Sequence, residues 1–127
     1  MPMEITKEEF EKMVSCALEE IPDYFKKHIK NLEFIVMEYP TVEMLRRVGL
    51  YGRGTLLGLY EGIPLRKRGP GYQAVLPDRI TLFMGPIIEQ SERLGIPLKE
   101  KIKKVLMHEI GHYFGLSEEE LREMGIA

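Results

Sequence analysis

The chain is 127 residues long, carries a formal net charge of −2 and contains 44 % hydrophobic and 30 % charged residues. This length fits one domain over residues 1–127 with a single modest core. The balanced charge gives no bulk basic character, so we expect no nucleic-acid partner. No apolar run in the sequence approaches the roughly 18 residues that a membrane-spanning helix needs.

The single cysteine and the N-terminal segment indicate where the protein works. Cys16 is the only cysteine, so the chain cannot form an internal disulfide, and we expect Cys16 to be a small buried residue in a helix. The segment MPMEITKEEF has neither the basic nor the apolar region of a signal peptide. A free thiol suits a reducing compartment. We therefore expect a cytoplasmic protein.

The first half of the chain contains clear local signals for secondary structure. Thr6 and Glu9 form the pattern of a capping box, and apolar residues recur at helical spacing after it, so we predict an amphipathic helix over residues 7–20. A helical turn over 22–29 and a strand over 32–38 follow. Residues 40–53 are undetermined and have room for a short helix. Two further strands, 56–60 and 79–84, are separated by a Gly/Pro/basic loop over 61–78, and a helix over 85–94 comes next.

These elements predict an α+β fold, a small mixed β-sheet of three or four strands packed with helices. An edge strand of such a sheet can bind an extended peptide by strand addition. Residues 56–60 and 79–84 are both candidates for that edge, and an ordinary internal strand is the alternative for each. We favour 56–60, because Gly58 would allow close approach of another backbone.

The segment HEIGHYFGLSE, residues 108–118, is the strongest functional signal. His108 and His112 are four residues apart, which on a helix places both imidazoles on one face, where they can bind one metal ion. Glu109 then lies beside that metal, where it can take a proton from water. The alternative for Glu109 is an exposed helix carboxylate. Zinc-dependent hydrolysis is the leading hypothesis.

The helix that carries this motif is expected to start after Pro97, a residue suited to a first turn. One side of it is apolar and is made by Ile102, Val105, Leu106, Ile110 and Tyr113. Lys101 and Lys104 project near the direction of the two histidines. The histidines therefore lie at the border of the apolar face, next to a cleft or solvent, whereas a core histidine would lie in its middle.

A third ligand is expected shortly after the motif helix. Gly115 supplies a turn, and Glu118 follows at the spacing of the extended zincin motif. Ser117 and Glu120 form a capping box, so Glu118 could instead be a first-turn acid that complements a helix dipole. Glu119 is a neighbouring competitor. With Glu118 as third ligand, a water would complete an open tetrahedral zinc site.

Three blocks of sequence carry a resemblance to a known family. They are LGLYEGIPL (57–65), PDRITLFMGPI (77–87) and VLMHEIGHYFGLSEEEL (105–121). Over about residues 5–125 the chain resembles the small bacterial zincin-like metallopeptidase family. This resemblance implies a zincin-like fold with HExxH on its active-site helix and a peptide or protein substrate.

The resemblance also implies roles for single residues. His108, His112 and Glu118 correspond to the zinc ligands of the family, and Glu109 to its catalytic acid and base. One position departs from the family, whose members often carry a third histidine directly after the second motif histidine. Here that residue is Tyr113, which we expect on the core side of the helix, away from the metal.

Two other functions remain open at this point. The first is a metal-dependent hydrolase of RNA or another phosphodiester, which would need a basic channel leading to the metal. The second is a non-catalytic, zinc-stabilised interaction module, which would need a closed site with four protein ligands. Cys16 and His28 lie far upstream without ligand spacing, and His28 stands in a basic, solvated stretch.

The loop between the last two predicted strands carries further polar candidates. Arg66, Lys67 and Arg68 invite a nucleic-acid interpretation, but three charges in a loop are usually a solvated turn. Tyr72 could stabilise an oxyanion in the active site, with packing as the alternative.

Overall fold

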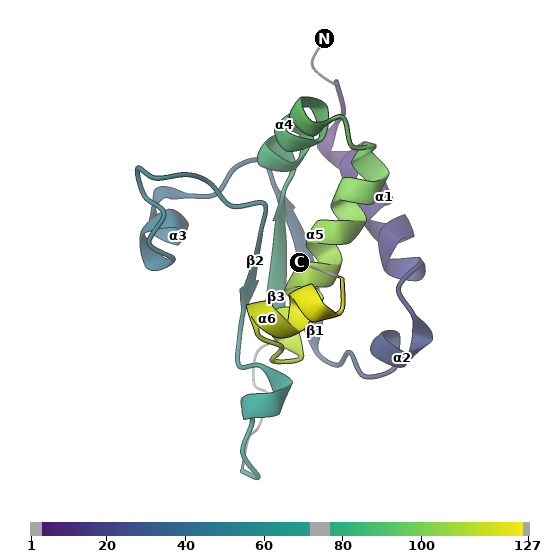
Figure 1. Ribbon diagram of the computed structural model, residues 1–127, viewed down its shortest axis with the longest axis vertical. Coiled ribbons are helices and arrows are strands. Elements are labelled where there is room, and N and C mark those ends of the chain that lie inside the picture. The colour runs from purple at the N-terminus through teal and green to yellow at the C-terminus, as the bar shows by residue number, and fades with distance from the viewer. Residues whose placement is uncertain (1–3, 72–76, 126–127) are drawn as a thin grey trace.

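The computed structural model describes residues 4–71 and 77–125. In chain order its elements are α1 (Lys7–Glu19), α2 (Asp23–Lys26), β1 (Leu32–Met37), α3 (Val42–Arg47), β2 (Gly58–Glu61), the 3-10 helix η1 (Leu65–Lys67), β3 (Asp78–Phe83), α4 (Met84–Leu94), α5 (Leu98–Tyr113) and α6 (Glu118–Glu123). Figure 1 shows α5 running beside the strands and α6 returning across its C-terminal end.

The sheet confirms the predicted α+β class and decides which strand lies at its edge. The three strands have the order β1-β3-β2. β1 pairs with β3 in parallel, with Leu32 opposite Asp78, and β2 pairs with β3 in antiparallel, with Gly58 opposite Leu82. β3 is therefore the central strand, and the proposal of 79–84 as an edge is wrong. β2 is an edge strand, as favoured from the sequence.

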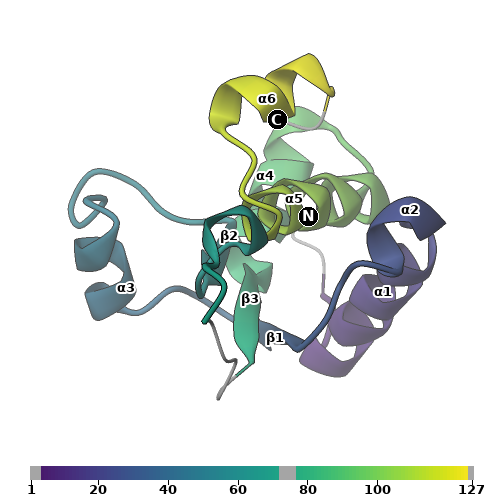
Figure 2. The ribbon, with the colours of Figure 1, turned by 90° about the horizontal axis from the view of Figure 1, so that it is seen from below.

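The core lies between the sheet and the two longest helices. α5 packs on α1, on α4 and on the strands β2 and β3. Figures 1 and 2 show α1 and α5 together on one face of the sheet, with α3 standing apart from both. The side chains that fill this space are apolar and almost fully buried, among them Phe10, Val14, Ala17, Ile80, Leu82, Ile87, Ile102, Leu106 and Ile110. α5 is thus packed against the edge strand β2 and the central strand β3.

Local signals set the helix boundaries where they were predicted. Thr6 and Ser117 each cap a helix through a complete capping box, with Glu9 and Glu120 as the reciprocal partners. Gly95 ends α4 in the left-handed conformation with φ 66°, which is why a second helix can start within a few residues. The undetermined segment 40–53 contains the short helix α3, capped by Thr41.

Cys16 corrects one expectation. It is exposed, although it lies in α1 as predicted. The buried positions of this helix are Phe10, Val14 and Ala17, which follow the four- and three-residue spacing of one helix face. Cys16 lies about 100° around the helix from Ala17 and so points away from that face.

Across the described ranges, no helix has both the length and the apolar character that a membrane crossing would require.

Candidate metal centre

Three side chains from α5 and α6 converge on one point. The Nε2 atoms of His108 and His112 are 3.1 Å apart. Glu118 Oε1 lies 3.3 Å from His108 Nε2 and 3.1 Å from His112 Nε2. In the part of the chain that the structure describes, this is the one group of three or more His, Cys, Asp or Glu side chains with ligand atoms within 4.8 Å of one another.

The geometry of this group fits a zinc ion. Zinc bonds of about 2.0–2.1 Å in a tetrahedral arrangement place neighbouring donor atoms about 3.3 Å apart. The three distances between the donor atoms are close to that value. Burial lowers the pKa of His108, which favours the neutral ring that a metal ligand requires. Three protein donors leave a fourth coordination position open.

The burial pattern of α5 explains why the histidines face a cleft. Ile102, Leu106 and Ile110 are at most 1 % exposed, and they anchor the opposite side of the helix in the core. His108 and His112 have side-chain exposures of 27 % and 31 %. They lie at the border of the apolar face, as predicted.

Tyr113, the departure from the family pattern, lies on the core side as predicted. Its side chain is completely buried. Its hydroxyl donates to the backbone carbonyl of Lys30 at 2.8 Å and accepts from the Lys30 amide at 3.0 Å. The tyrosine therefore connects the motif helix to the segment before β1 and leaves the metal centre unobstructed.

The turn after α5 brings Glu118 back to the histidines. Gly115 has φ +87°, a left-handed conformation that favours glycine. Its amide donates to the His112 carbonyl, and the Leu116 amide donates to the Gly111 carbonyl, which together form a Schellman motif. α6 then begins at Glu118, while Ser117 and Glu120 make its capping box. Glu118 fits both interpretations from the sequence. It is an acid in the first turn of α6, and its carboxylate also reaches the two histidines.

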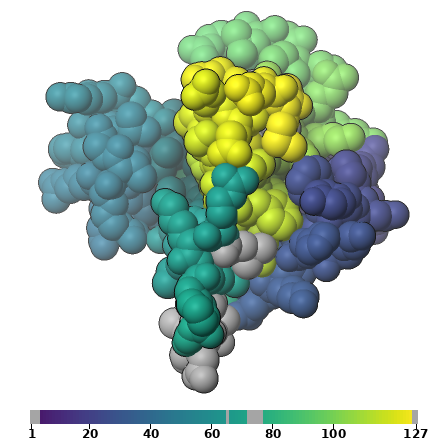
Figure 3. Space-filling model, turned by 60° about the horizontal axis from the view of Figure 1, so that its bottom comes forward, coloured from purple at the N-terminus to yellow at the C-terminus, as the bar shows by residue number. Residues whose placement is uncertain are grey.

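A second contact holds this turn from the outside. A Cβ atom on Gly115 would lie 2.7 Å from Arg66 Cβ, so the two segments touch closely. The Arg66 guanidinium also binds the Glu120 carboxylate at 3.1 Å. Figure 3 shows the C-terminal segment in yellow resting against the teal segment that contains Arg66. Glu120 is thus committed to the cap and to Arg66, and Glu118 is the acid that faces the histidines.

Glu109 lies beside this group in a buried position. It is only 8 % exposed, and burial raises the pKa of its carboxyl group to about 7, with a smaller opposing effect from the Tyr60 backbone amide. Such a carboxyl group can both accept and donate a proton near neutral pH. It is not the exposed helix carboxylate of the alternative interpretation.

The edge strand presents its backbone to the same cleft. The Phe83 amide donates to the Leu57 carbonyl directly opposite, and in an antiparallel ladder the direction of the bonds alternates from one residue to the next. The amide and carbonyl groups of Gly58 and Tyr60 therefore point away from β3, out of the open edge of the sheet. A cleft of about 680 Å³ runs between this edge and the donor group, and its walls include Gly58, Tyr60, His108, Glu109, His112 and Glu118.

A family model described as zincin-like metallopeptidase matches residues 29–126, well over half of the chain. The chain belongs to the zincin-like metallopeptidase family. A search of curated proteins gave no match. Family membership agrees with the fold, with the position of HExxH on α5 and with the His/His/Glu group, and it implies a metal, zinc above all, at this centre.

One polar cluster of this zincin-like protein was missed by the sequence analysis. Asp78 is 4 % exposed, and its carboxylate accepts hydrogen bonds from the Tyr60 hydroxyl and the Arg68 guanidinium, both at 2.6 Å. The carboxylate also packs directly against Gly62. This cluster fixes the loop after β2 to the start of β3. These residues have no short-range spacing that would have predicted the contact.

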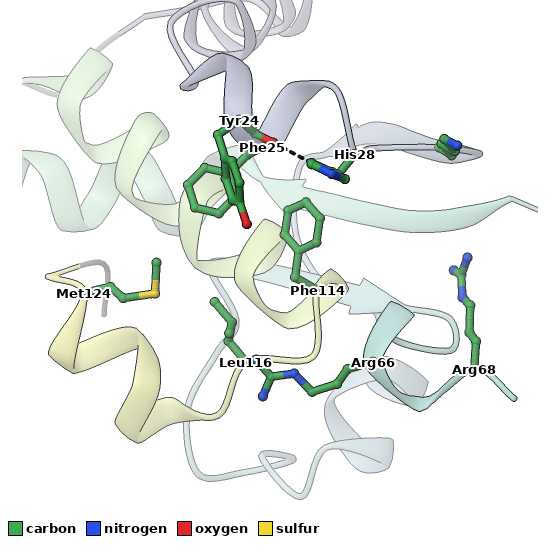
Figure 4. Close-up of a pocket in the computed structure, with 9 residues that line it drawn as sticks. Tyr24, Phe25, His28, Arg66, Arg68, Phe114, Leu116 and Met124 are labelled. Atoms are coloured by element: carbon green, nitrogen blue, oxygen red, sulfur yellow. Dashed lines mark hydrogen bonds between the residues drawn. The ribbon is translucent and has the colours of Figure 1, made fainter.

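His28 lies in a different pocket from the candidate metal centre. A separate pocket of about 590 Å³ is drawn in Figure 4, where Tyr24, Phe25 and Phe114 form an aromatic wall and Arg66 and Arg68 stand at the other side. Its walls, as far as the structure describes them, include none of the predicted metal ligands. His28 lines this pocket, and its Nδ1 is 2.7 Å from the Tyr24 carbonyl oxygen.

The loop candidates also have definite outcomes. Arg66 and Arg68 are engaged by Glu120 and Asp78. Arg66 remains exposed, at 55 % of its side chain, as expected of a solvated turn. Arg68 is only 14 % exposed, so the solvated turn is wrong for Arg68 alone. Lys67 lines the metal cleft. Tyr72 lies outside the described residues.

Proposed function

We propose that the protein is a zinc-dependent peptidase in which His108, His112 and Glu118 bind zinc and Glu109 is the general base and acid. The convergence of the three donor atoms at zinc spacing carries the proposal. Glu109 supports it, because the buried carboxyl group next to the histidines has a pKa of about 7. The exposed free thiol of Cys16 suits the reducing cytoplasm as the place of action.

The residues of the chain divide the reaction between them. A bound zinc supplies Lewis-acid chemistry, polarising the scissile carbonyl and making water more acidic. Glu109 takes a proton from the attacking water, whose oxygen bonds to the carbonyl carbon. As the carbon–nitrogen bond breaks, Glu109 gives this proton to the leaving amine. Burial of Glu109 in the cleft suits both transfers, since its two protonation states are similar in free energy near neutral pH.

An extended peptide is the substrate that the cleft fits best. The outward amide and carbonyl of Gly58 and the outward carbonyl of Tyr60 can pair with a peptide added beside β2, while the Tyr60 amide interacts with Glu109. That added strand would lie in the cleft that contains Glu109 and the donor group. The substrate is thus recognised through its main chain, with side-chain preferences set by the neighbouring pockets.

The first test is Glu109→Gln, which keeps the size of the side chain and removes its ability to take a proton. We expect the variant to bind zinc with unchanged stoichiometry and to lose about 100- to 10,000-fold in peptide hydrolysis. Elemental analysis and the cleavage of a mixed peptide library measure the two quantities. Glu119→Gln is the matched control, because Glu119 is exposed and lies outside the donor group.

Three outcomes would contradict the proposal. Unchanged peptide hydrolysis by zinc-loaded Glu109→Gln would remove the assigned base. Cleavage of RNA, but not of peptides, by the same zinc-loaded wild-type sample would establish the phosphodiester alternative. Tight zinc binding without turnover of either substrate would favour an interaction module.

A further inference from the structure

A second, smaller pocket opens beside the candidate metal centre. It has a volume of about 300 Å³ and lies between the first half of α5 and residues 55–58, just before and at the start of β2. It shares Gly58, His108 and Glu109 with the metal cleft. A peptide laid along β2 past Glu109 would therefore place one of its residues here.

The pocket is marked by two lysines from α5. Lys101 and Lys104 both line it. Lys101 stands about two turns before His108 on the helix, and Lys104 about one turn before it. Lys101 is only 7 % exposed, which is rare for a lysine without a counter-charge. In the described ranges, no carboxylate forms an ion pair with either lysine.

The charged neighbours that act on Lys101 are cations, although Glu109 lines the same pocket. Burial lowers the pKa of its ammonium group, and the cations of Lys104 and Arg93 lower it further. A largely buried lysine that lines a pocket beside other cations is an arrangement that an incoming anion would stabilise. Structural reasons for a lysine at this position are weak, because a methionine or leucine would fill the same space at a lower desolvation cost.

The remaining walls indicate which anion fits. Leu56, Leu57 and Val105 make them largely apolar, so the ligand carries its negative charge on a short apolar stem. A carboxylate on a peptide has this form. An RNA backbone would instead need a basic surface that continues over several phosphates, whereas the lysines here are two and the chain has a net charge of −2.

We propose that the pocket lined by Lys101 and Lys104 is a specificity subsite that binds a substrate carboxylate next to the scissile peptide bond. The carboxylate belongs either to an aspartate or glutamate side chain or to the C-terminus of the peptide. The inference rests on the proposed peptidase function and names its substrate class, peptides with a negative charge close to the cleaved bond.

Matched peptides test the preference. One set of peptides of alanine and leucine carries a single glutamate at each position in turn, and a twin set carries glutamine there. A second pair differs only in ending in a free carboxylate or in a carboxamide. We expect one glutamate position, or the free C-terminus, to raise kcat/KM by about 10- to 100-fold over its neutral twin, the range of a hydrogen-bonded charge. The responding pair identifies the source of the carboxylate.

Variants of the two lysines assign the preference to the pocket. Lys101→Met keeps the apolar stem and removes the ammonium group, so the preference should fall to within about twofold of neutral peptides. Lys104→Glu, at an exposed position of α5, should reverse it towards peptides with lysine at the same place. Lys103→Met is the control, because Lys103 is exposed and does not line this pocket, and it should keep the preference.

A binding measurement separates this inference from the proposed reaction. Fluorescence anisotropy of the same labelled peptides with zinc-loaded Glu109→Gln reports recognition without turnover. If no peptide is cleaved but the charged twin binds more tightly, and Lys101→Met abolishes the difference, the subsite stands and the reaction is wrong. Equal cleavage and equal binding of charged and neutral twins would overturn the subsite and leave the peptidase intact. Lysine-dependent binding of RNA without a peptide preference would also overturn it.

Discussion

At the scale of single residues, Gly58 is a position where the edge strand packs tightly against the motif helix. A Cβ atom there would lie 2.9 Å from Glu109 Cγ and 3.0 Å from Val105 Cγ1. We therefore predict that Gly58→Ala pushes α5 from β2, lowers the free energy of unfolding by about 1–3 kcal/mol and reduces peptide hydrolysis by displacing Glu109. Urea unfolding and steady-state kinetics measure the two effects.

Gly54→Ala is the control for this variant. Gly54 precedes the same strand, and an added Cβ would meet no atom within 4 Å. We expect this substitution to change neither stability nor hydrolysis by a measurable amount. If Gly58→Ala behaved like Gly54→Ala in both assays, the close packing of Glu109 against β2 would not be a requirement of the site.

Residues that act through local spacing could be predicted from the sequence, and residues that act through distant partners could not. The four-residue offset of His108 and His112 is fixed by helix geometry. The burial of Asp78 depends instead on Tyr60 and Arg68, from the end of β2 and the loop that follows it. Gly58 was singled out for the approach of a substrate, whereas the atoms that approach it belong to Glu109 and Val105.

At the scale of elements, α6 has only six residues and carries Glu118 at its first position. A helix this short depends on its cap. We predict that Ser117→Ala, which removes the acceptor of the Glu120 amide, destabilises α6 by about 1 kcal/mol and weakens zinc binding by about fivefold. The physical reason is that, without the cap, part of the free energy of zinc binding is used to order Glu118, so the affinity for zinc falls. Competition with a chelator of known affinity measures the change.

Thr6→Ala provides the matched comparison. Thr6 and Ser117 both accept a hydrogen bond of 3.1 Å from the amide of their capping-box partner, but Thr6 caps α1. Its loss should lower the free energy of unfolding by a similar amount and leave the affinity for zinc unchanged. Equal affinity for zinc in both variants would mean that Glu118 contributes little to the metal centre.

The order of elements along the chain was predictable, whereas their neighbours in space were only partly so. Capping boxes, glycines and prolines act within a few residues, and they placed both ends of α1 and α4 and the start of α5 to within one residue. Strand order is decided by long-range packing, so both 56–60 and 79–84 were candidates for the edge, with 56–60 favoured only through Gly58. The structure places β3 between β1 and β2 and leaves β2 at the edge. Lys101 was expected near the direction of the histidines, but its low exposure of 7 % and its position in a pocket shared with residues 55–57 depend on the tertiary structure.

At the scale of the whole molecule, the metal centre joins α5, which is packed on several other elements, to α6, which has little buried surface. α5 is packed on α1, α4 and the sheet, whereas in α6 only Leu121 is buried. Zinc held by His108, His112 and Glu118 would therefore add a connection between α5 and α6 that exists only in the folded state. Ligands of the folded state stabilise it by mass action, so zinc should protect the protein against heat.

We predict that free zinc at one hundred times its dissociation constant raises the melting temperature by about 10 °C, from about 2.7 kcal/mol of linkage. Differential scanning fluorimetry with buffered zinc, and with magnesium as the metal control, measures the shift. Glu118→Ala should lose most of it, whereas Glu119→Ala, at an exposed position beside it, should keep it. An equal shift in both variants would exclude Glu118 as the third ligand and leave water or another acid for that position. The absence of a shift in the wild type would mean that zinc is not a ligand of the folded state.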